Sequence, residues 1–133
     1  MREKPSWDEY FLAIAQVVKT RSSCERDQVG AVIVGSDNRI RATGYNDAPA
    51  GDPGCEACPR RLTGVAPGSA YEGRFSCVAH HAEENAILYC DEDDLSFSTL
   101  YITREPCYLC QGLIVNKGIR RIVTPVGEFL LNY

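Results

Sequence analysis

Two short motifs with metal-binding side chains constrain this chain more than any other feature of its sequence. Cys107 and Cys110 stand three residues apart directly after Pro106, and proline suits the first turn of a helix because it has no amide hydrogen to lose there. The second motif, residues 81–83 (HAE), opens the preceding predicted helix. A predicted strand lies between the two helices, so a right-handed crossover would bring both helix starts together. The motifs therefore predict an α/β sheet in which two helix starts share one metal ion.

The side chains of these motifs suit a catalytic zinc ion. A catalytic zinc takes three protein ligands and keeps a fourth position for water, and His81, Cys107 and Cys110 supply three ligands. Both cysteines would bind as thiolates, because a helix N-terminus lowers the pKa of a thiol and zinc removes its proton. Glu83 can reach the activated water without binding the metal, which predicts general acid/base catalysis. The arrangement matches the H-x-E…P-C-x-x-C signature of zinc nucleobase deaminases.

Each part of this pattern also has a less specific interpretation. An isolated C-x-x-C can be a redox pair, and a single histidine is more often structural than metal-binding. A purely structural zinc would need a fourth ligand, which the two motifs do not contain. Their combination, in this order and at two helix starts, favours the catalytic site.

The remaining elements follow from local signals. Ser6 and Glu9 have capping-box spacing before an apolar run, which predicts a first helix over 6–21. Gly35 to Arg39 carries turn residues between two β-rich runs, which predicts a hairpin. The pattern of residues 126–133 is ambiguous. The further predicted elements are strands 29–34, 40–45, 99–103 and 121–124 and helices 82–90 and 107–117.

A long stretch without apolar periodicity, residues 47–79, interrupts this pattern. Ordering it would cost backbone entropy with few apolar side chains to offset that cost. Four residues in it or at its end are spaced like the two halves of a structural zinc site, which would stabilise the loop. The alternative is that these are free or buried thiols. The four are Cys55, Cys58, Cys77 and His80, with Cys24 as a substitute ligand.

Composition limits the class of protein. With 133 residues, 44% of them hydrophobic, the chain fits one domain over 1–133. The net charge of −4 comes from interspersed acidic and basic residues, so no basic face predicts binding to long nucleic acid. No run of residues is long and apolar enough for a membrane span or a signal peptide. The seven cysteines are more naturally metal ligands or catalytic thiols in a reducing compartment than disulfides. We therefore expect a cytoplasmic protein.

The chain resembles the cytidine and deoxycytidylate deaminase superfamily, most closely its deoxycytidylate branch. Residues 81–87 (HAEENAI) and 106–110 (PCYLC) carry the resemblance, and residues 7–15 (WDEYFLAIA), 29–34 (VGAVIV) and 44–46 (GYN) extend it. The resemblance implies a three-layer α/β/α fold around a central mixed sheet of four to five strands. It also implies hydrolytic deamination of dCMP to dUMP with release of ammonia, which supplies dUMP for thymidylate synthesis.

The resemblance also suggests how substrate binds. Asn46 would hold the sugar, although an asparagine after a strand can equally cap a turn. Ala82 would line the pocket beside the metal ligands. Among the surface arginines, Arg26 and Arg104 lie nearest the expected pocket mouth and are candidates for phosphate binding.

Two departures from the family pattern affect regulation and assembly. Asp47 stands where relatives often have glycine in a loop tied to nucleotide regulation, and its carboxylate would repel a triphosphate. The chain also ends at Tyr133, where relatives usually continue through another helix and strand, which leaves four full strands and an exposed sheet edge. We expect self-association as a homo-oligomer to cover that edge.

Other functions share this chemistry. Another deaminase, acting on dCTP, a modified dCMP, cytidine, guanine or tRNA adenosine, would use the same zinc site. The acidic charge argues against tRNA. A catalytically silent zinc or nucleotide-binding module is the alternative from another class, and Glu83 argues against it because a silent module needs no carboxylate beside an open zinc position.

Overall fold

A five-stranded mixed sheet forms the centre of the protein. The computed structural model describes residues 2–24, 27–47, 81–106 and 108–131. Along the sheet the strand order is β2-β1-β3-β4-β5. β1 pairs antiparallel with β2 and β3, β3 pairs parallel with β4, and β4 pairs antiparallel with β5. The strands are β1 (Gly30–Val34), β2 (Ile40–Tyr45), β3 (Thr99–Ile102), β4 (Arg121–Thr124) and β5 (Gly127–Leu130).

The first helix covers one face of this sheet. α1 (Trp7–Val18) continues into the short 3-10 turn η1 (Lys19–Arg21). The predicted capping box is present, because the Glu9 amide donates to Ser6 Oγ at 3.2 Å and the Ser6 amide donates to Glu9 Oε1 at 3.2 Å. Phe11 and Ala15 pack from α1 against the sheet residues Val32, Val34, Tyr101 and Val123.

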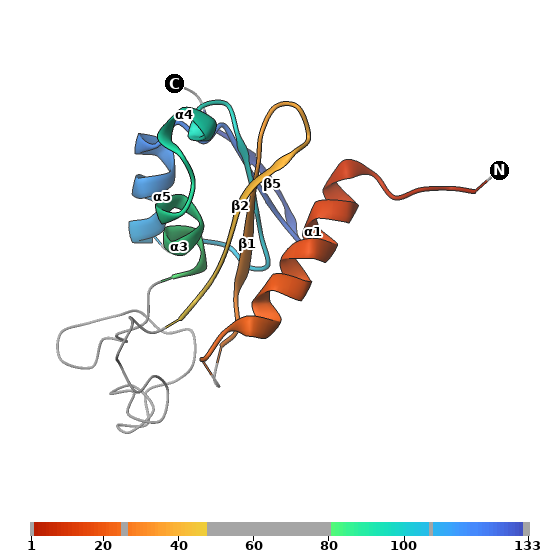
Figure 1. Cartoon of the computed structure of the whole chain (residues 1–133), viewed down its shortest axis with the longest axis horizontal. Coiled ribbons are helices and arrows are strands. Elements are labelled where there is room, and N and C mark those ends of the chain that lie inside the picture. The colour runs from red at the N-terminus through yellow and green to blue at the C-terminus, as the bar shows by residue number, and fades with distance from the viewer. Residues whose placement is uncertain (1, 25–26, 48–80, 107, 132–133) are drawn as a thin grey trace.

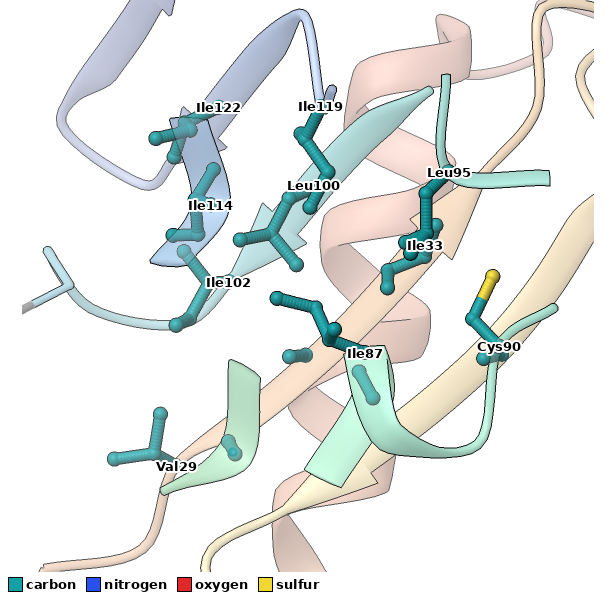
Figure 2. Packing of buried hydrophobic residues seen from close by; sticks show 14 residues of the cluster. Val29, Ile33, Ile87, Cys90, Leu95, Leu100, Ile102, Ile114, Ile119 and Ile122 are labelled. Carbon is teal, nitrogen blue, oxygen red and sulfur yellow. The ribbon is translucent and has the colours of Figure 1, made fainter. Parts of the chain in front are cut away.

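The other helices cover the opposite face. These are α3 (Ala82–Leu88), α4 (Glu92–Leu95) and α5 (Tyr108–Asn116), and Figure 1 shows them across the sheet from α1. Both faces of β1 are therefore covered: Ala31 and Ile33 belong to the cluster under α3 and α5, whereas Val32 and Val34 belong to the cluster under α1. Figure 2 shows the larger cluster, with Ile33, Leu100 and Ile114 among its members. The layers are α/β/α, as the sequence predicted.

Most predicted elements are confirmed, with ends shifted by one to three residues. The hairpin is present, and its turn is closed by hydrogen bonds from Gly35 N to Arg39 O and from Asn38 N to Gly35 O. The sheet has five strands, within the predicted four to five, because residues 127–130 form β5 against β4. The narrower expectation of four full strands missed this last strand. α4 was not predicted. Within the described ranges, none of the helices combines the length and apolar character that a membrane span needs.

Candidate active site

The catalytic motifs meet at one end of the sheet. β2 and β3 both run antiparallel to β1, so they run in the same direction. α3 follows β2 in the chain and α5 follows β3, and Figure 1 shows these two helices next to each other on one side of the sheet. The carboxyl ends of strands are where α/β proteins commonly bind ligands, because the following helices begin there. Within the described residues, the starts of α3 and α5 therefore lie close together at this end of the sheet.

Three of the predicted side chains lie within reach of one another. His81 is the N-cap residue of α3, and its Nδ1 lies 3.1 Å from the Cys110 Sγ on α5. The Glu83 Oε1 lies 3.7 Å from the same His81 nitrogen. Cys110 and Glu83 are each only 3% exposed, and His81 is half-buried. Cys107 lies outside the described residues.

This donor set fits zinc. A nitrogen and a sulfur that share one tetrahedral zinc are about 3.5 Å apart, given bond lengths of about 2.0–2.1 Å and 2.3 Å. The observed 3.1 Å between His81 and Cys110 is close to that value. The ligand atoms of His81, Glu84 and Cys110 also lie within 4.8 Å of one another. Glu84 already accepts a hydrogen bond from the His81 amide at 3.1 Å, which is a helix-capping contact.

Glu83 is placed for proton transfer. Burial by itself raises the pKa of its carboxyl, but hydrogen bonds with His81 and Cys110 lower it more, so the pKa of Glu83 lies below its ordinary value. The carboxylate is thus held in the ionised form inside the protein. A buried carboxylate is costly unless it is paired or hydrogen-bonded. It lies beside the His81 nitrogen and the Cys110 sulfur, where an ionised carboxylate is able to accept a proton.

The side chain of Asn46 forms several hydrogen bonds within the protein. Its Oδ1 accepts from Ser22 Oγ at 2.6 Å and from the Val29 amide at 2.9 Å, and its Nδ2 donates to Asp27 O at 2.6 Å. An amide oxygen has two lone pairs and an amide nitrogen two hydrogens. Among the described residues, one Nδ2 hydrogen of Asn46 is left without an acceptor, so a substrate contact by this side chain would be as a donor.

The other predicted contact residues have different surroundings. Ala82 is buried at the start of α3, next to His81. Arg104, which follows β3, forms an ion pair with Asp27 and is 45% exposed at its side chain. Cys24 is half-buried in the segment after η1. Arg26 and the proposed second zinc ligands Cys55, Cys58, Cys77 and His80 lie outside the described residues.

Sequence reasoning did not assign a role to Asn85. Its Nδ2 donates to the carbonyl oxygen of Tyr45 at 2.8 Å, which joins α3 to the end of β2. Glu84 was likewise left without a role, although it stands three residues after the helix-capping His81. That spacing is the capping-box signal and would have identified it.

Comparison with known proteins identifies the family of this chain. A family model described as the cytidine and deoxycytidylate deaminase zinc-binding region matches residues 5–126. The chain is 60% identical over 124 residues to the deoxycytidylate deaminase of Mycobacterium phage D29, covering 92% of this chain and 96% of that protein. It is 35% identical over 119 residues to the human deoxycytidylate deaminase, covering 88% of this chain and 63% of that protein. The chain thus spans less than two thirds of the human relative.

The fold has a solved counterpart as well. The crystal structure of dCMP deaminase from the cyanophage S-TIM5, in complex with dCMP and dUMP, superposes with a TM-score of 0.70 at 26% identity. The match covers 92% of this chain and 83% of that chain. This likeness confirms the predicted three-layer fold around a mixed sheet.

Proposed function

The chain belongs to the cytidine and deoxycytidylate deaminase family, and from this we propose that it converts dCMP and water into dUMP and ammonia. In this reaction a bond forms between C4 of cytosine and the water oxygen, and the bond from C4 to the exocyclic nitrogen breaks. The observation that carries the proposal is the buried Glu83 carboxylate beside His81 and Cys110. A site that only bound nucleotide would not need a buried carboxylate there.

The residues that would hold zinc are His81, Cys107 and Cys110. When bound, zinc supplies a water whose pKa is lowered to near neutrality, so that it can act as a nucleophile at ordinary pH. The chain's own contribution is the arrangement of the ligands. His81 is fixed at the N-cap of α3 by the hydrogen bond from its amide to Glu84, and Cys110 is buried on α5.

Glu83 moves the protons. Its ionised carboxylate takes a proton from the attacking water and returns it to the leaving nitrogen, which departs as ammonia. A lowered pKa keeps the carboxylate ionised and so available to accept a proton, and the buried position keeps it directed at one place. Burial also keeps bulk water from competing for the proton.

The substrate contacts are part of the same proposal. Asn46 would donate its remaining Nδ2 hydrogen to a sugar hydroxyl, and Ala82 would line the base pocket. Arg26 and Arg104 would bind the phosphate, and Arg104 would then share its guanidinium between the phosphate and Asp27, its present partner.

Further aspects extend the proposal to the whole protein. We propose a single deaminase domain over 1–133 that supplies dUMP for thymidylate synthesis in the cytoplasm, where a reducing environment keeps thiol ligands free.

We also propose self-association through the edge strand β5. The residues of β5 are all exposed, Leu130 at 67%, and the neighbouring Val126 is 88% exposed. A second, structural zinc held by Cys55, Cys58, Cys77 and His80 would raise the zinc content to two ions per chain.

Replacing Glu83 by glutamine tests the central claim. The Glu83→Gln side chain keeps its size but cannot accept the proton, so we expect deamination of dCMP to fall by about 10²–10⁴-fold while zinc content stays that of the wild type. Glu92→Gln is the matched control, since the Glu92 side chain on α4 is 83% exposed. Ammonia release from CMP, dCMP, dCTP, deoxycytidine, adenosine and guanine, with zinc per chain measured on the same samples, provides the readout.

Three results would contradict the proposal. The first is a Glu83→Gln protein that deaminates dCMP as fast as the Glu92→Gln control. The second is a zinc-loaded wild type that releases ammonia only from adenosine or guanine. The third is a wild type that deaminates nothing, which would favour a silent binding module.

A further inference from the structure

Helix α3 carries both His81 and Glu83, so its placement on the sheet decides where these side chains lie. The helix lies directly on β2 at Gly44, a buried residue that pairs with Ala31. A Cβ added at Gly44 would lie 2.4 Å from the Ala82 oxygen, 2.4 Å from the Ala86 nitrogen and 2.9 Å from the Ala86 Cα. All three are backbone atoms that cannot rotate away. The absence of a Cβ at Gly44 therefore sets the distance between α3 and β2.

Apolar packing alone holds the rotation of α3 only weakly near its start. Among the buried apolar side chains of this helix, Ile87 lies near the C-terminal end, whereas Ala82 and Ala86 offer single methyl groups that add little resistance to a roll. The attraction between apolar surfaces has no preferred direction. A directional contact at a position other than Gly44 is therefore needed to hold helix α3 in one rotational orientation.

Asn85 provides that contact. Its side-chain Nδ2 donates to Tyr45 O at the end of β2 at 2.8 Å, and its backbone amide donates to His81 O at 3.0 Å. One residue therefore connects the backbone of the metal-binding histidine with the strand beside Gly44. Hydrogen bonds prefer a narrow range of angles, so this one resists both rolling and sliding of the helix.

We propose that Gly44 and Asn85 are positioning residues for the active site. Gly44 sets how closely α3 approaches β2, and Asn85 sets its rotation, so that His81 and Glu83 face Cys110. Neither residue touches the reacting atoms. The inference rests on the proposed function for the roles of His81 and Glu83, but its structural part concerns the orientation of α3 alone.

Substitution of Asn85 tests the proposal. Asn85→Ala removes the donor, and Asn85→Asp keeps the size of the side chain while losing the amide hydrogens. Leu88→Ala is the matched control on the same helix, since Leu88 is 69% exposed. Gly44→Ala is a third test variant, and the Asn85 variants keep the test decisive if that protein does not fold. Measurements are kcat and KM for dCMP, and the affinity for Zn²⁺ by competition with a chelator, well below the unfolding temperature.

We expect both Asn85 variants to lose about 10²-fold in kcat, as for a displacement of catalytic groups by about 1 Å, with KM nearly unchanged. Zinc affinity should fall by about 10–100-fold, as when outer-shell partners of metal ligands are removed. The Leu88→Ala control should match the wild type in both measurements. The proposal is wrong if the Asn85 variants melt at a lower temperature but keep the kcat and zinc affinity of the control.

The zinc measurement separates this inference from the proposed function. Should the wild type fail to deaminate dCMP while the Asn85 variants still bind zinc more weakly than the control, the function is wrong and the positioning role stands. Should the wild type deaminate dCMP and the Asn85 variants equal the control, the positioning role alone is wrong.

Discussion

Asn46 illustrates how one side chain can serve the fold and the site together. Its amide joins Ser22, Asp27 and Val29, which lie on the segment between η1 and β1. This segment also supplies Asp27 as the partner of Arg104. The side chain is thus part of the structure around the site whether or not it also contacts a sugar.

Replacing Asn46 by alanine should therefore destabilise the protein in the absence of substrate. The change leaves the buried Val29 amide without its acceptor, which costs about 1–3 kcal/mol of unfolding free energy. Asn46→Asp keeps an oxygen acceptor for Ser22 and Val29 and should lose less. Urea unfolding of the three proteins without ligand measures the difference. Equal stability of Asn46→Ala and wild type would show that these hydrogen bonds contribute nothing.

The sequence predicts residues of the site where the signal is local. His81, Glu83 and Cys110 were predicted to lie together because their spacing within two short motifs, taken in combination, favours a catalytic zinc site. The partner of Arg104 could not be found in this way, since Asp27 is 77 residues away in the chain and only the sheet brings them together. The same holds for Asn85, whose acceptor Tyr45 lies on another element.

Helices and strands follow the same rule: those with a clear local sequence signal were predicted, and β5, which lacks one, was not. α1 begins where its capping box predicts, and the first hairpin turns where Gly35 and Asn38 permit it; Asn38 has a positive φ of 60°. β5 was missed because its residues are exposed and show no alternation. Its partner is β4, reached through a turn at residues 125–126, and the first residue of β5, Gly127, pairs with Thr124.

Gly30 on β1 allows α1 to pack closely on the sheet, as Gly44 does for α3. A Cβ added at Gly30 would lie 2.2 Å from the Ala15 oxygen and 2.6 Å from the Lys19 nitrogen. Gly30→Ala must therefore push α1 away from β1, and overpacking of this kind costs about 1–3 kcal/mol. Thermal and urea unfolding of the variant should show this loss.

Gly112 in α5 supplies the matched control for that substitution. Within the described part of the chain, no heavy atom lies within 4 Å of a Cβ added at this exposed position. Since alanine is favoured over glycine in a helix, Gly112→Ala should stabilise the protein by about 0.5–1 kcal/mol. If both glycine substitutions had the same effect, the contact between Gly30 and α1 would not be the cause.

At the scale of the whole molecule, one polar network joins the first helix to the last strands. Asp8 on α1 accepts from Arg121 Nη1 at 2.9 Å and from the hydroxyl of buried Tyr101 at 2.8 Å. Arg121 on β4 also donates through Nε to Glu128 on β5 at 2.5 Å. The network spans 113 residues of sequence between Asp8 and Arg121. It lines a cavity of about 360 Å³ between the start of α1 and the β1–β2 hairpin.

This network predicts how stability depends on pH. The hydrogen bond from Arg121 lowers the pKa of Asp8, burial opposes it, and the Tyr101 hydrogen bond lowers it further, so the folded pKa lies below the ordinary value. A depressed carboxyl pKa contributes stability above the unfolded pKa of about 3.9 and loses it as pH falls toward the folded value. Asp8→Asn should therefore be less stable than wild type at pH 6, by about 0.5–1 kcal/mol because the pair is partly exposed.

The difference between wild type and Asp8→Asn should begin to shrink once pH falls below about 3.9, because Asp8 then gains a proton in the unfolded protein before it does so in the folded protein. It should also shrink with added salt at pH 6, since ions screen a partly exposed pair. Glu3→Gln, at an exposed residue before α1, controls for the removal of one negative charge. Urea unfolding at pH 6, 4.5 and 3 measures all three proteins. A constant difference in unfolding free energy between wild type and Asp8→Asn across this range would contradict the prediction. It would mean that the charge of Asp8 does not contribute to the contact between α1 and β4, and that packing and uncharged contacts hold these elements together.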